Sequence, residues 1–430
     1  MKRANALFFV LFACSGNDAT IDGGTDAATG NDVTPEYYVK ETAPPSPTFV
    51  DLTAGAQHTC VIVAYGVQHA TYCFGAAAAL GATTNGILAV ASAGLATSTS
   101  PNFLQIGSSH GANHTCAIDD QKQVFCWGDN TLGQCGTGTT SPNVATPTVS
   151  FDSQVGIIKA ASLAIGSTAS CVVRATGGKL GCFGDNGKCQ TDLWDSGGCS
   201  ASAYAAVDTT DTDVVFKNVT SAAIGAIHGC VAADPAGGGS AALFCFGDNA
   251  SLESAPAGKA ITAPAIAITT PAKVISIATG DAHTCFVTDS PHQLFCFGKN
   301  DQHQASPTSN SATIDPSAAT AITLPKTGLP NMVFARATET CVVDTDGLLF
   351  CFGSTHGTNI DEITGVKDVG RVALGGGHTC IIGHLPSDSV SAPGSLLCWG
   401  DNTNGQVGQT AGGTVSTPTA VVIPDSAPTQ

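Results

Sequence analysis

Residues 113–138 read NHTCAIDDQKQVFCWGDNTLGQCGTG, a pattern typical of a β-hairpin. Residues 114–118 and 124–127 favour strands, and the polar residues 119–123 between them predict a chain reversal before a Gly-Asp-Asn turn. Variants of this stretch recur, with a first cysteine at Cys60, Cys116, Cys171, Cys230, Cys285, Cys341 and Cys380 and a second at Cys73, Cys126, Cys182, Cys245, Cys296, Cys351 and Cys398. Seven copies of one unit predict a repeat protein.

The two cysteines of each copy are placed to face each other across the hairpin. If Cys116 lies opposite Cys126, then Ala117 faces Phe125 and the register is consistent with the polar reversal. Opposed residues have Cα atoms roughly 4.5 to 5.5 Å apart, a separation that a disulfide can span. We therefore predict seven cross-strand disulfides, each contributing roughly 2 to 3 kcal/mol in the chain-entropy treatment. Buried free thiols are the alternative, and zinc is disfavoured because no copy has the CxxC spacing of four-ligand sites.

Composition restricts the classes of partner. Charged residues make up 11% of the 430 residues, and 33 acidic residues exceed 16 basic ones. We therefore expect no nucleic-acid binding and no binding of the folded part to an anionic membrane. A period near 55 residues indicates one closed array. The step from Cys341 to Cys380 is only 39 residues, so we expect the last unit to have lost a loop.

Each unit reads as a strand, a Gly turn, the two cysteine strands, and a long variable segment such as 76–101 or 186–213. The variable segments look like loops with at most one short strand. Helical spacing is nearly absent, so the expected class is all-β. Residues 416–423, STPTAVVI, would form a C-terminal strand that joins the first unit and closes the ring, because an unpaired apolar strand would leave an exposed edge.

The recurring text G-x-x-H-T-C…C-[WF]-G-x-N-x-x-G-Q-x-G, best seen at 113–138 and 377–408, resembles the repeat of the regulator of chromosome condensation family. The resemblance covers residues 49 to 423 and implies a seven-bladed β-propeller. The family's bacterial extracytoplasmic members often carry paired cysteines. We expect the aromatic residue after each second cysteine to pack between blades.

The N-terminus indicates export. Met1-Lys2-Arg3 is followed by an apolar run at 4–12, and Leu11-Phe12-Ala13-Cys14 resembles a bacterial lipobox. Eighteen cysteines also favour an oxidising compartment. The expected organisation is a signal peptide at 1–14 with lipidated Cys14, a tether at 15–48 and the propeller at 49–430. Ser15 favours the outer membrane or cell surface; plain secretion and an incidental N-terminus remain alternatives.

Several repeated side chains could suggest metal sites. Histidine lies two residues before the first cysteine in five units and is replaced by Ala169 and Glu339 in the third and sixth. With two gaps and one residue per unit, we expect these histidines to have a structural role. Residues 401–405 faintly resemble a calcium loop, but the later acidic ligand is missing, so a turn is expected. Cys189 and Cys199 could bridge each other. Cys135, in the place of Val407, is either buried or shared with another chain.

The sequence predicts binding rather than catalysis. No Ser-His-Asp, paired-carboxylate or phosphate-loop pattern stands out, and the other histidines are scattered as solvated loop residues: His69, His110, His292, His303, His356 and His384. We expect no cofactor, a monomer, and a non-enzymatic scaffold for a protein or glycan partner, touching the membrane only through its lipid. The alternatives are a secreted enzyme inhibitor or enzyme and, by analogy with the family namesake, guanine-nucleotide exchange.

Overall fold

The computed structural model describes residues 47–80, 88–89, 101–152, 156–191, 199, 216–235, 242–389 and 394–424. The signal peptide, Cys14 and nearly all of the tether lie outside these residues. Contacts divide the chain into Met1–Ala43 and a compact unit Pro44–Gln430, and the second unit contains all the described structure. No helix in the described part of the chain is long and apolar enough to cross a membrane.

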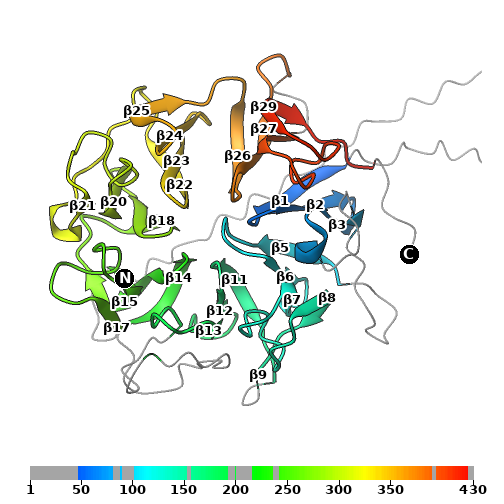
Figure 1. Ribbon diagram of the computed structural model, residues 1–430, viewed down its shortest axis with the longest axis horizontal. Coiled ribbons are helices and arrows are strands. Elements are labelled where there is room, and N and C mark those ends of the chain that lie inside the picture. Colours follow the sequence, from blue (N-terminus) through cyan, green and yellow to red (C-terminus); the bar gives the residue numbers. More distant parts are fainter. Residues whose placement is uncertain are drawn as a thin grey trace, which may run out of the picture. The chain divides into compact units, whose positions relative to one another are not determined.

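Pro44–Gln430 is a ring of seven antiparallel sheets, or blades (Figure 1). The innermost strands are β1 (Thr48–Ala54), β5 (Phe103–Gly107), β11 (Ala160–Ile165), β14 (Phe216–Ile224), β18 (Val274–Thr279), β22 (Pro330–Arg336) and β26 (Lys367–Leu374). The second strands are β2 (His58–Tyr65), β6 (His114–Asp119), β12 (Ala169–Arg174), β15 (His228–Pro235), β19 (His283–Thr288), β23 (Glu339–Asp344) and β27 (His378–His384). The predicted all-β propeller is confirmed.

The outer strands follow in chain order. The third strands are β3 (Gln68–Gly75), β7 (Val124–Asp129), β13 (Leu180–Gly184), β16 (Ala242–Asp248), β20 (Gln293–Lys299), β24 (Leu349–Gly353) and β28 (Ser395–Asp401). The fourth strands are β4 (Leu88–Ala89), β8 (Asn143–Val149), β17 (Ile261–Ile268), β21 (Thr313–Ile314), β25 (Gly357–Glu362) and β29 (Thr414–Ala420). The third blade has three strands within the described residues. A short hairpin of β9 (Phe151–Asp152) and β10 (Gly156–Ile157), and the 3-10 helices η1 (Ala77–Leu80) and η2 (Pro316–Ala318), complete the structure.

A disulfide joins the second and third strands of every blade. Cys116 lies opposite Cys126, Ala117 opposite Phe125 and Ile118 opposite Val124, as the hairpin register predicted. In the seven hairpins the paired Cα atoms are 4.0 to 4.1 Å apart, close to the roughly 4.5 Å typical of directly opposed residues. With the pair of Cys189 and Cys199 the described residues hold eight disulfides, which is compatible with an extracytoplasmic location.

Three details differ from the expectations. Several variable segments contribute a full fourth strand rather than a loop with one short strand, because their alternation of Thr with small residues gives a weak strand signal. The missing loop belongs to the sixth blade, where three residues separate β24 from β25. The C-terminal strand β29 pairs with β28 of its own blade; Val421 and Ile423 beyond it pack in the cluster that contains Leu52 and Phe74 of the first blade.

The hydrophobic core is divided among the spaces between blades. Each of the main apolar clusters joins side chains of neighbouring sheets, and the cluster that holds Phe74 and Val407 spans the first and last blades. The aromatic residues after the second cysteine are buried in six blades, as predicted: Phe74, Trp127, Phe183, Phe246, Phe297 and Phe352. A propeller therefore needs an interaction at every seam between blades, since no single core holds the ring together.

The repeated histidine provides that interaction. Nε2 of His283 lies 2.9 Å from Oγ1 of Thr340 in the next blade, and this hydroxyl donates to the carbonyl of Gln304 at 2.8 Å. Because the hydroxyl proton is used by the carbonyl, Nε2 must donate to Oγ1 and the neutral ring leaves Nδ1 unprotonated. Burial lowers the pKa of His283 to about 3, so the ring stays neutral.

The same bond recurs around the ring. The other histidine-to-hydroxyl pairs are His58 with Thr115, His114 with Ser170, His228 with Thr284, and His378 with Thr59, all at 2.7 to 2.8 Å. The bond of His378 to Thr59 closes the ring between the seventh and first blades. The third unit lacks the histidine, and at the facing position of the fourth blade Gly229 replaces the hydroxyl residue. Both partners of the bond are therefore absent at this seam.

Removing one seam hydroxyl should destabilise the propeller. In Thr340→Val the His283 Nε2 and the Gln304 carbonyl are left buried without partners, and we expect a loss of about 2 to 4 kcal/mol in the free energy of unfolding. Urea denaturation measures it. Thr340→Ser is the control, since Ser170 fills this role in the third blade; equal losses for both variants would contradict the role of the hydroxyl.

Candidate functional site

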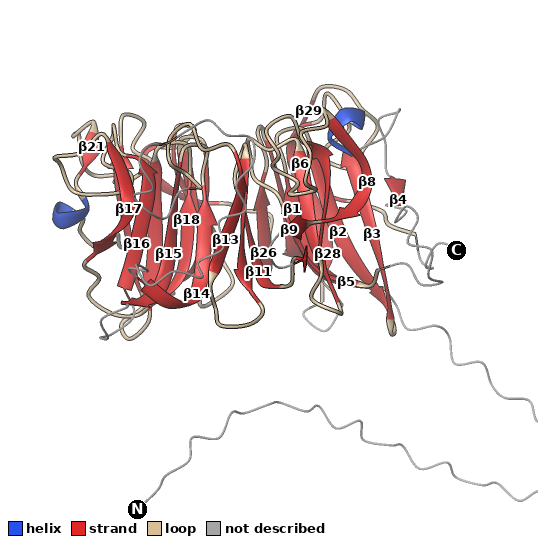
Figure 2. Cartoon of the chain, turned by 90° about the horizontal axis from the view of Figure 1, so that it is seen from below, coloured by secondary structure: helices blue, strands red, loops and turns tan. Residues whose placement is uncertain are grey.

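The propeller has two ends with different construction. Because consecutive strands are antiparallel, the turns from first to second strand and the loops from third to fourth strand emerge on the same side. We call this side the Gly-turn end. The opposite side, called the reversal end, carries the turns between the two cysteine strands. The long loops gather at the Gly-turn end, which is at the top of Figure 2. Loops on a rigid scaffold are where binding surfaces usually form, so the Gly-turn end is the candidate site.

Five of the long loops at the Gly-turn end are each organised around one asparagine. The side-chain oxygen of Asn300 accepts from the amides of Ala305 and Ser306, and its Nδ2 donates to the carbonyls of Ser309 and Ser311. Equivalent bonds are made by Asn130, Asn186, Asn249 and Asn402. The Asn402 amide is thereby engaged with the backbone at 407 and 410, which fits the turn expected for residues 401–405.

In the third and seventh blades a glutamine fixes the start of the loop to the neighbouring aspartate. Gln406 accepts from the Asn404 amide at 2.8 Å and donates through Nε2 to Asp401 at 2.8 Å. Gln190 bonds to Asp185 in the same way. The amide group is suited to this position because it donates to the carboxylate and accepts from the backbone at the same time.

The fourth blade has Glu253 in the place of this glutamine. Its Oε2 accepts from the Ser251 amide, while its Oε1 is buried without a partner. Asp248, which the glutamine would satisfy, instead receives Nζ of Lys188 from the third blade at 3.0 Å. Burial first, and then the nearby Asp248, raises the pKa of Glu253 to about 7. A protonated Glu253 can replace the missing amide donor, and an ionised one cannot.

The loop between β5 and β6 closes the Gly-turn end over the axis of the ring. Six residues separate Gly107 from His114, compared with four between the equivalent Thr53 and His58. Nε2 of buried His110 in this loop lies 2.8 Å from Oδ1 of Asp281 in the fifth blade.

Contacts to other blades confirm that this loop lies across the axis. The carbonyl of Ala112 accepts from the Ala56 amide of the first blade at 2.8 Å. A methyl group on Gly376 of the seventh blade would lie 3.1 Å from the His110 carbonyl. One loop from the second blade thus touches the first, fifth and seventh blades. The hydrogen bond to His110 is the main cause of a lowered pKa of Asp281.

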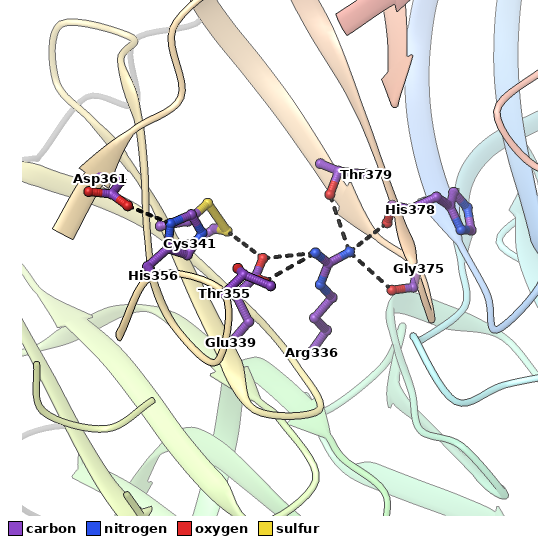
Figure 3. A network of polar contacts seen from close by, with 10 residues as sticks. Arg336, Glu339, Cys341, Thr355, His356, Asp361, Gly375, His378 and Thr379 are labelled. Carbon is purple, nitrogen blue, oxygen red and sulfur yellow. Dashed lines mark hydrogen bonds and ion pairs between the residues drawn. A yellow bond between two sulfur atoms is a disulfide. The ribbon is translucent and has the colours of Figure 1, made fainter. Parts of the chain in front are cut away.

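The sixth blade replaces the histidine bond with an ion pair (Figure 3). Arg336 donates to both oxygens of Glu339 at 3.0 and 3.2 Å. Its other nitrogen reaches the seventh blade, donating to the His378 carbonyl at 2.9 Å and to Oγ1 of Thr379 at 3.3 Å. Thr355, in the short turn that replaces the long loop, donates to Glu339 at 2.9 Å. Arg336 therefore supplies the seam contact that a histidine makes elsewhere.

The potential ligand atoms of Glu339, Cys341 and Cys351 lie within 4.8 Å of one another. The two sulfurs are joined in a disulfide, so neither is a thiolate that could bind a metal ion. This group is part of the seam between the sixth and seventh blades.

The loop histidines expected to be solvated have specific partners. His110 binds Asp281, and His356 binds Asp361 at 2.9 Å. His69, His292 and His303 bond through Nδ1 to backbone carbonyls. They do not converge on one site. The longer loop before His114 and the glutamate at position 253 are the features of the sequence that could have indicated the candidate site.

The remaining cysteines have separate environments. Cys135 is a buried free thiol whose sulfur donates to the Asp129 carbonyl, and burial raises its pKa far above the usual range. Cys189 and Cys199 are joined. Cys14 lies outside the described residues.

Glu253→Gln should change how stability depends on pH. A carboxyl group with a pKa raised in the folded state stabilises the protein below the unfolded pKa, and this contribution is lost as the pH rises through about 7. We expect Glu253→Gln to leave the free energy of unfolding unchanged near pH 5 and to raise it by about 2 kcal/mol at pH 8. Denaturation at the two pH values measures the difference. Gln406→Glu is the matched reverse change, because Gln406 bonds to Asp401, the equivalent of Asp248, and it should destabilise only at high pH. A gain independent of pH would contradict this account.

Comparisons with known proteins agree with the fold. The Regulator of chromosome condensation (RCC1) repeat matches residues 105–134 and 274–304, and a second description of it matches 122–173. Human WBSCR16 is 16% identical, with a TM-score of 0.63 over 79% of this chain and 84% of that chain. Prp20p from Saccharomyces cerevisiae, described with its binding properties to Gsp1p and histones, is 17% identical, with a TM-score of 0.58 over 75% and 77%. A search of curated proteins gives no match. The chain is therefore a seven-bladed β-propeller in which residues 105–173 and 274–304 match the RCC1 repeat.

Proposed function

We propose that the protein is a non-enzymatic binding scaffold of the cell envelope or surface, anchored through a lipid on Cys14, with the loops of its Gly-turn end presented to a protein or glycan partner. The observation that carries the proposal is the construction of these loops. The asparagine amides hold their backbone, while side chains such as Thr131 and Thr140 are exposed. A surface whose backbone is already ordered loses little conformational entropy when it binds.

The titratable groups at this end support binding over catalysis. Asp281 is paired with His110, Glu339 with Arg336, and Asp248 with Lys188. General acid–base or nucleophilic catalysis needs a base within reach of a nucleophile and free to exchange protons. An enzyme inhibitor and a nucleotide-exchange factor have no observation of their own in their favour among the described residues, and the likeness to Prp20p carries the fold alone.

Cys14→Ala should abolish lipid attachment. We expect metabolic labelling with a fatty acid to mark the wild-type protein, and the variant to be unlabelled and recovered in the soluble fraction. Cys135→Ala is the control and should keep the label, because the Cys135 thiol is buried. A label that persists in Cys14→Ala would contradict the anchor.

Partner contact should map to the Gly-turn end. A photo-reactive benzoylphenylalanine at Thr131 or Thr140 should give a discrete protein or glycan adduct in cells, and the same probe at exposed Gln121 on the reversal end should give none. Gel shift and mass spectrometry detect the adducts. Adducts only from position 121, or turnover of a substrate by the purified protein, would contradict the scaffold function.

A further inference from the structure

Exposed apolar side chains are concentrated on one side of the ring. Eight large hydrophobic residues in the described part of the chain are exposed. Seven belong to turns or strand ends on the reversal end: Val67, Leu104, Phe151, Ile157, Ile275, Leu329 and Val422. Ile261, at the start of β17, is the exception. Single exposed apolar residues are normal on protein surfaces, but such a bias toward one side indicates a contact surface.

The second and third blades hold the densest part of this surface. Phe151 and Ile157 lie directly opposite each other in the β9–β10 hairpin, so their side chains share one face of it. They are 47% and 45% exposed. Lys122 occupies the neighbouring reversal, and Lys159 follows the hairpin, bridging to Gln123. Both lysines are exposed, and no acidic partner lies within ion-pair distance of either among the described residues.

The Gly-turn end is mainly acidic, whereas lysines are in excess on the reversal end of the second and third blades. The Gly-turn end has acidic side chains in six of its turns and loops: Asp129, Asp185, Asp248, Asp281, Asp301 and Asp401. On the reversal end of the second and third blades, the exposed charged side chains that the structure describes are Lys122, Lys159 and Lys179 and one aspartate, Asp120. An anionic surface would therefore repel the Gly-turn end and accept this part of the reversal end.

The chain also enters the propeller from the reversal end. Thr48, the first residue of β1, pairs with Ala64 beside the reversal at Gly66. Cys14 precedes Thr48 by 34 residues, a length that reaches at most about 110 Å when extended. The tether from an anchor at Cys14 would thus join the propeller at its reversal end.

We propose that the reversal end docks on the headgroup region of a bilayer that contains anionic phospholipids, with Phe151 and Ile157 placed among the headgroups and Lys122 and Lys159 bound to phosphates. The exposed apolar side chains are distributed over several blades, so a planar surface can contact them together more readily than a compact protein can. Exposed apolar groups and lysines reinforce one another at a membrane surface, and one lipid chain alone holds a protein only reversibly. The inference extends the proposed anchoring and replaces the expectation that the folded part avoids anionic membranes. Lys122 and Lys159 are far apart in the sequence, so the sequence alone shows no basic cluster.

Vesicle sedimentation tests this docking separately from the anchor. The chain from Ser15 onward contains the whole compact unit and lacks Cys14, so its binding owes nothing to lipidation. We expect it to sediment with phosphatidylethanolamine–phosphatidylglycerol vesicles and much less with phosphatidylcholine vesicles, and to be released by 0.5 M salt. Phe151→Ser with Ile157→Ser, and Lys122→Glu with Lys159→Glu, should each weaken binding at least about tenfold.

Matched variants on the other end control for general effects. Ile261→Ser removes an exposed apolar residue and Lys259→Glu reverses an exposed charge, both at the Gly-turn end, and each should change binding less than about twofold. Thermal unfolding checks that every variant is folded. The proposal is overturned if the wild-type chain does not bind anionic vesicles, or if the control variants weaken binding as much as the reversal-end variants. Absence of lipid on Cys14 would overturn the proposed anchor and leave this measurement unaffected.

Discussion

The ring depends on the hydrogen bonds of a hydroxyl group that recurs from blade to blade and belongs to the residue before the first cysteine. It accepts from a histidine of the preceding blade and donates to a carbonyl in the long loop of that same blade, as Thr340 does with His283 and Gln304. The adjacent cysteine fixes the hairpin through its disulfide. Seam, loop and hairpin are thus connected within two residues. Because each seam encloses its own part of the core, the bond is repeated at five of the seven seams.

The departures from the repeat follow the same constraint. In the sixth blade the long loop is missing, so the loop carbonyl that a seam hydroxyl binds elsewhere is missing too, and Arg336 reaches Thr379 in its place. The charge of Arg336 is balanced by Glu339, which stands at the histidine position. In the fourth blade, Glu253 replaces a glutamine and can take over its bonds only when protonated. Each departure changes the chemistry of a contact while keeping its place in the fold.

Much of this architecture could be predicted from the sequence, because it is local. The hairpin register follows from the spacing of Cys116 and Cys126, and the number of blades from counting such pairs. What could not be predicted depends on distant partners: Asp281 is 171 residues from His110, and nothing near either residue indicates the pairing. The C-terminal fourth strand was expected at 416–423, but the others were expected only as short strands in the variable segments, because their side chains alternate weakly. Glu253 differs from the equivalent glutamines in having a carboxyl group in place of an amide. The effect of this change depends on Asp248, whose position beside Glu253 the sequence does not show.

The seam between the third and fourth blades has lost its polar bond on both sides, at Ala169 and Gly229. The space beside Gly229 is filled by Ile224 and Phe246 of the same blade, whose atoms would lie within 3.0 Å of a methyl group there. Among the described residues, the polar contacts that remain across this seam are the Lys188–Asp248 ion pair and the backbone bonds of Val219 to Gly178 and of Ser167 to Gly225. A closed ring under strain opens first at the seam with the weakest contacts between blades. Opening of the ring by force or by denaturant should therefore begin at this seam, which lacks the buried histidine bond, while the His378–Thr59 bond on the other side of the ring stays intact.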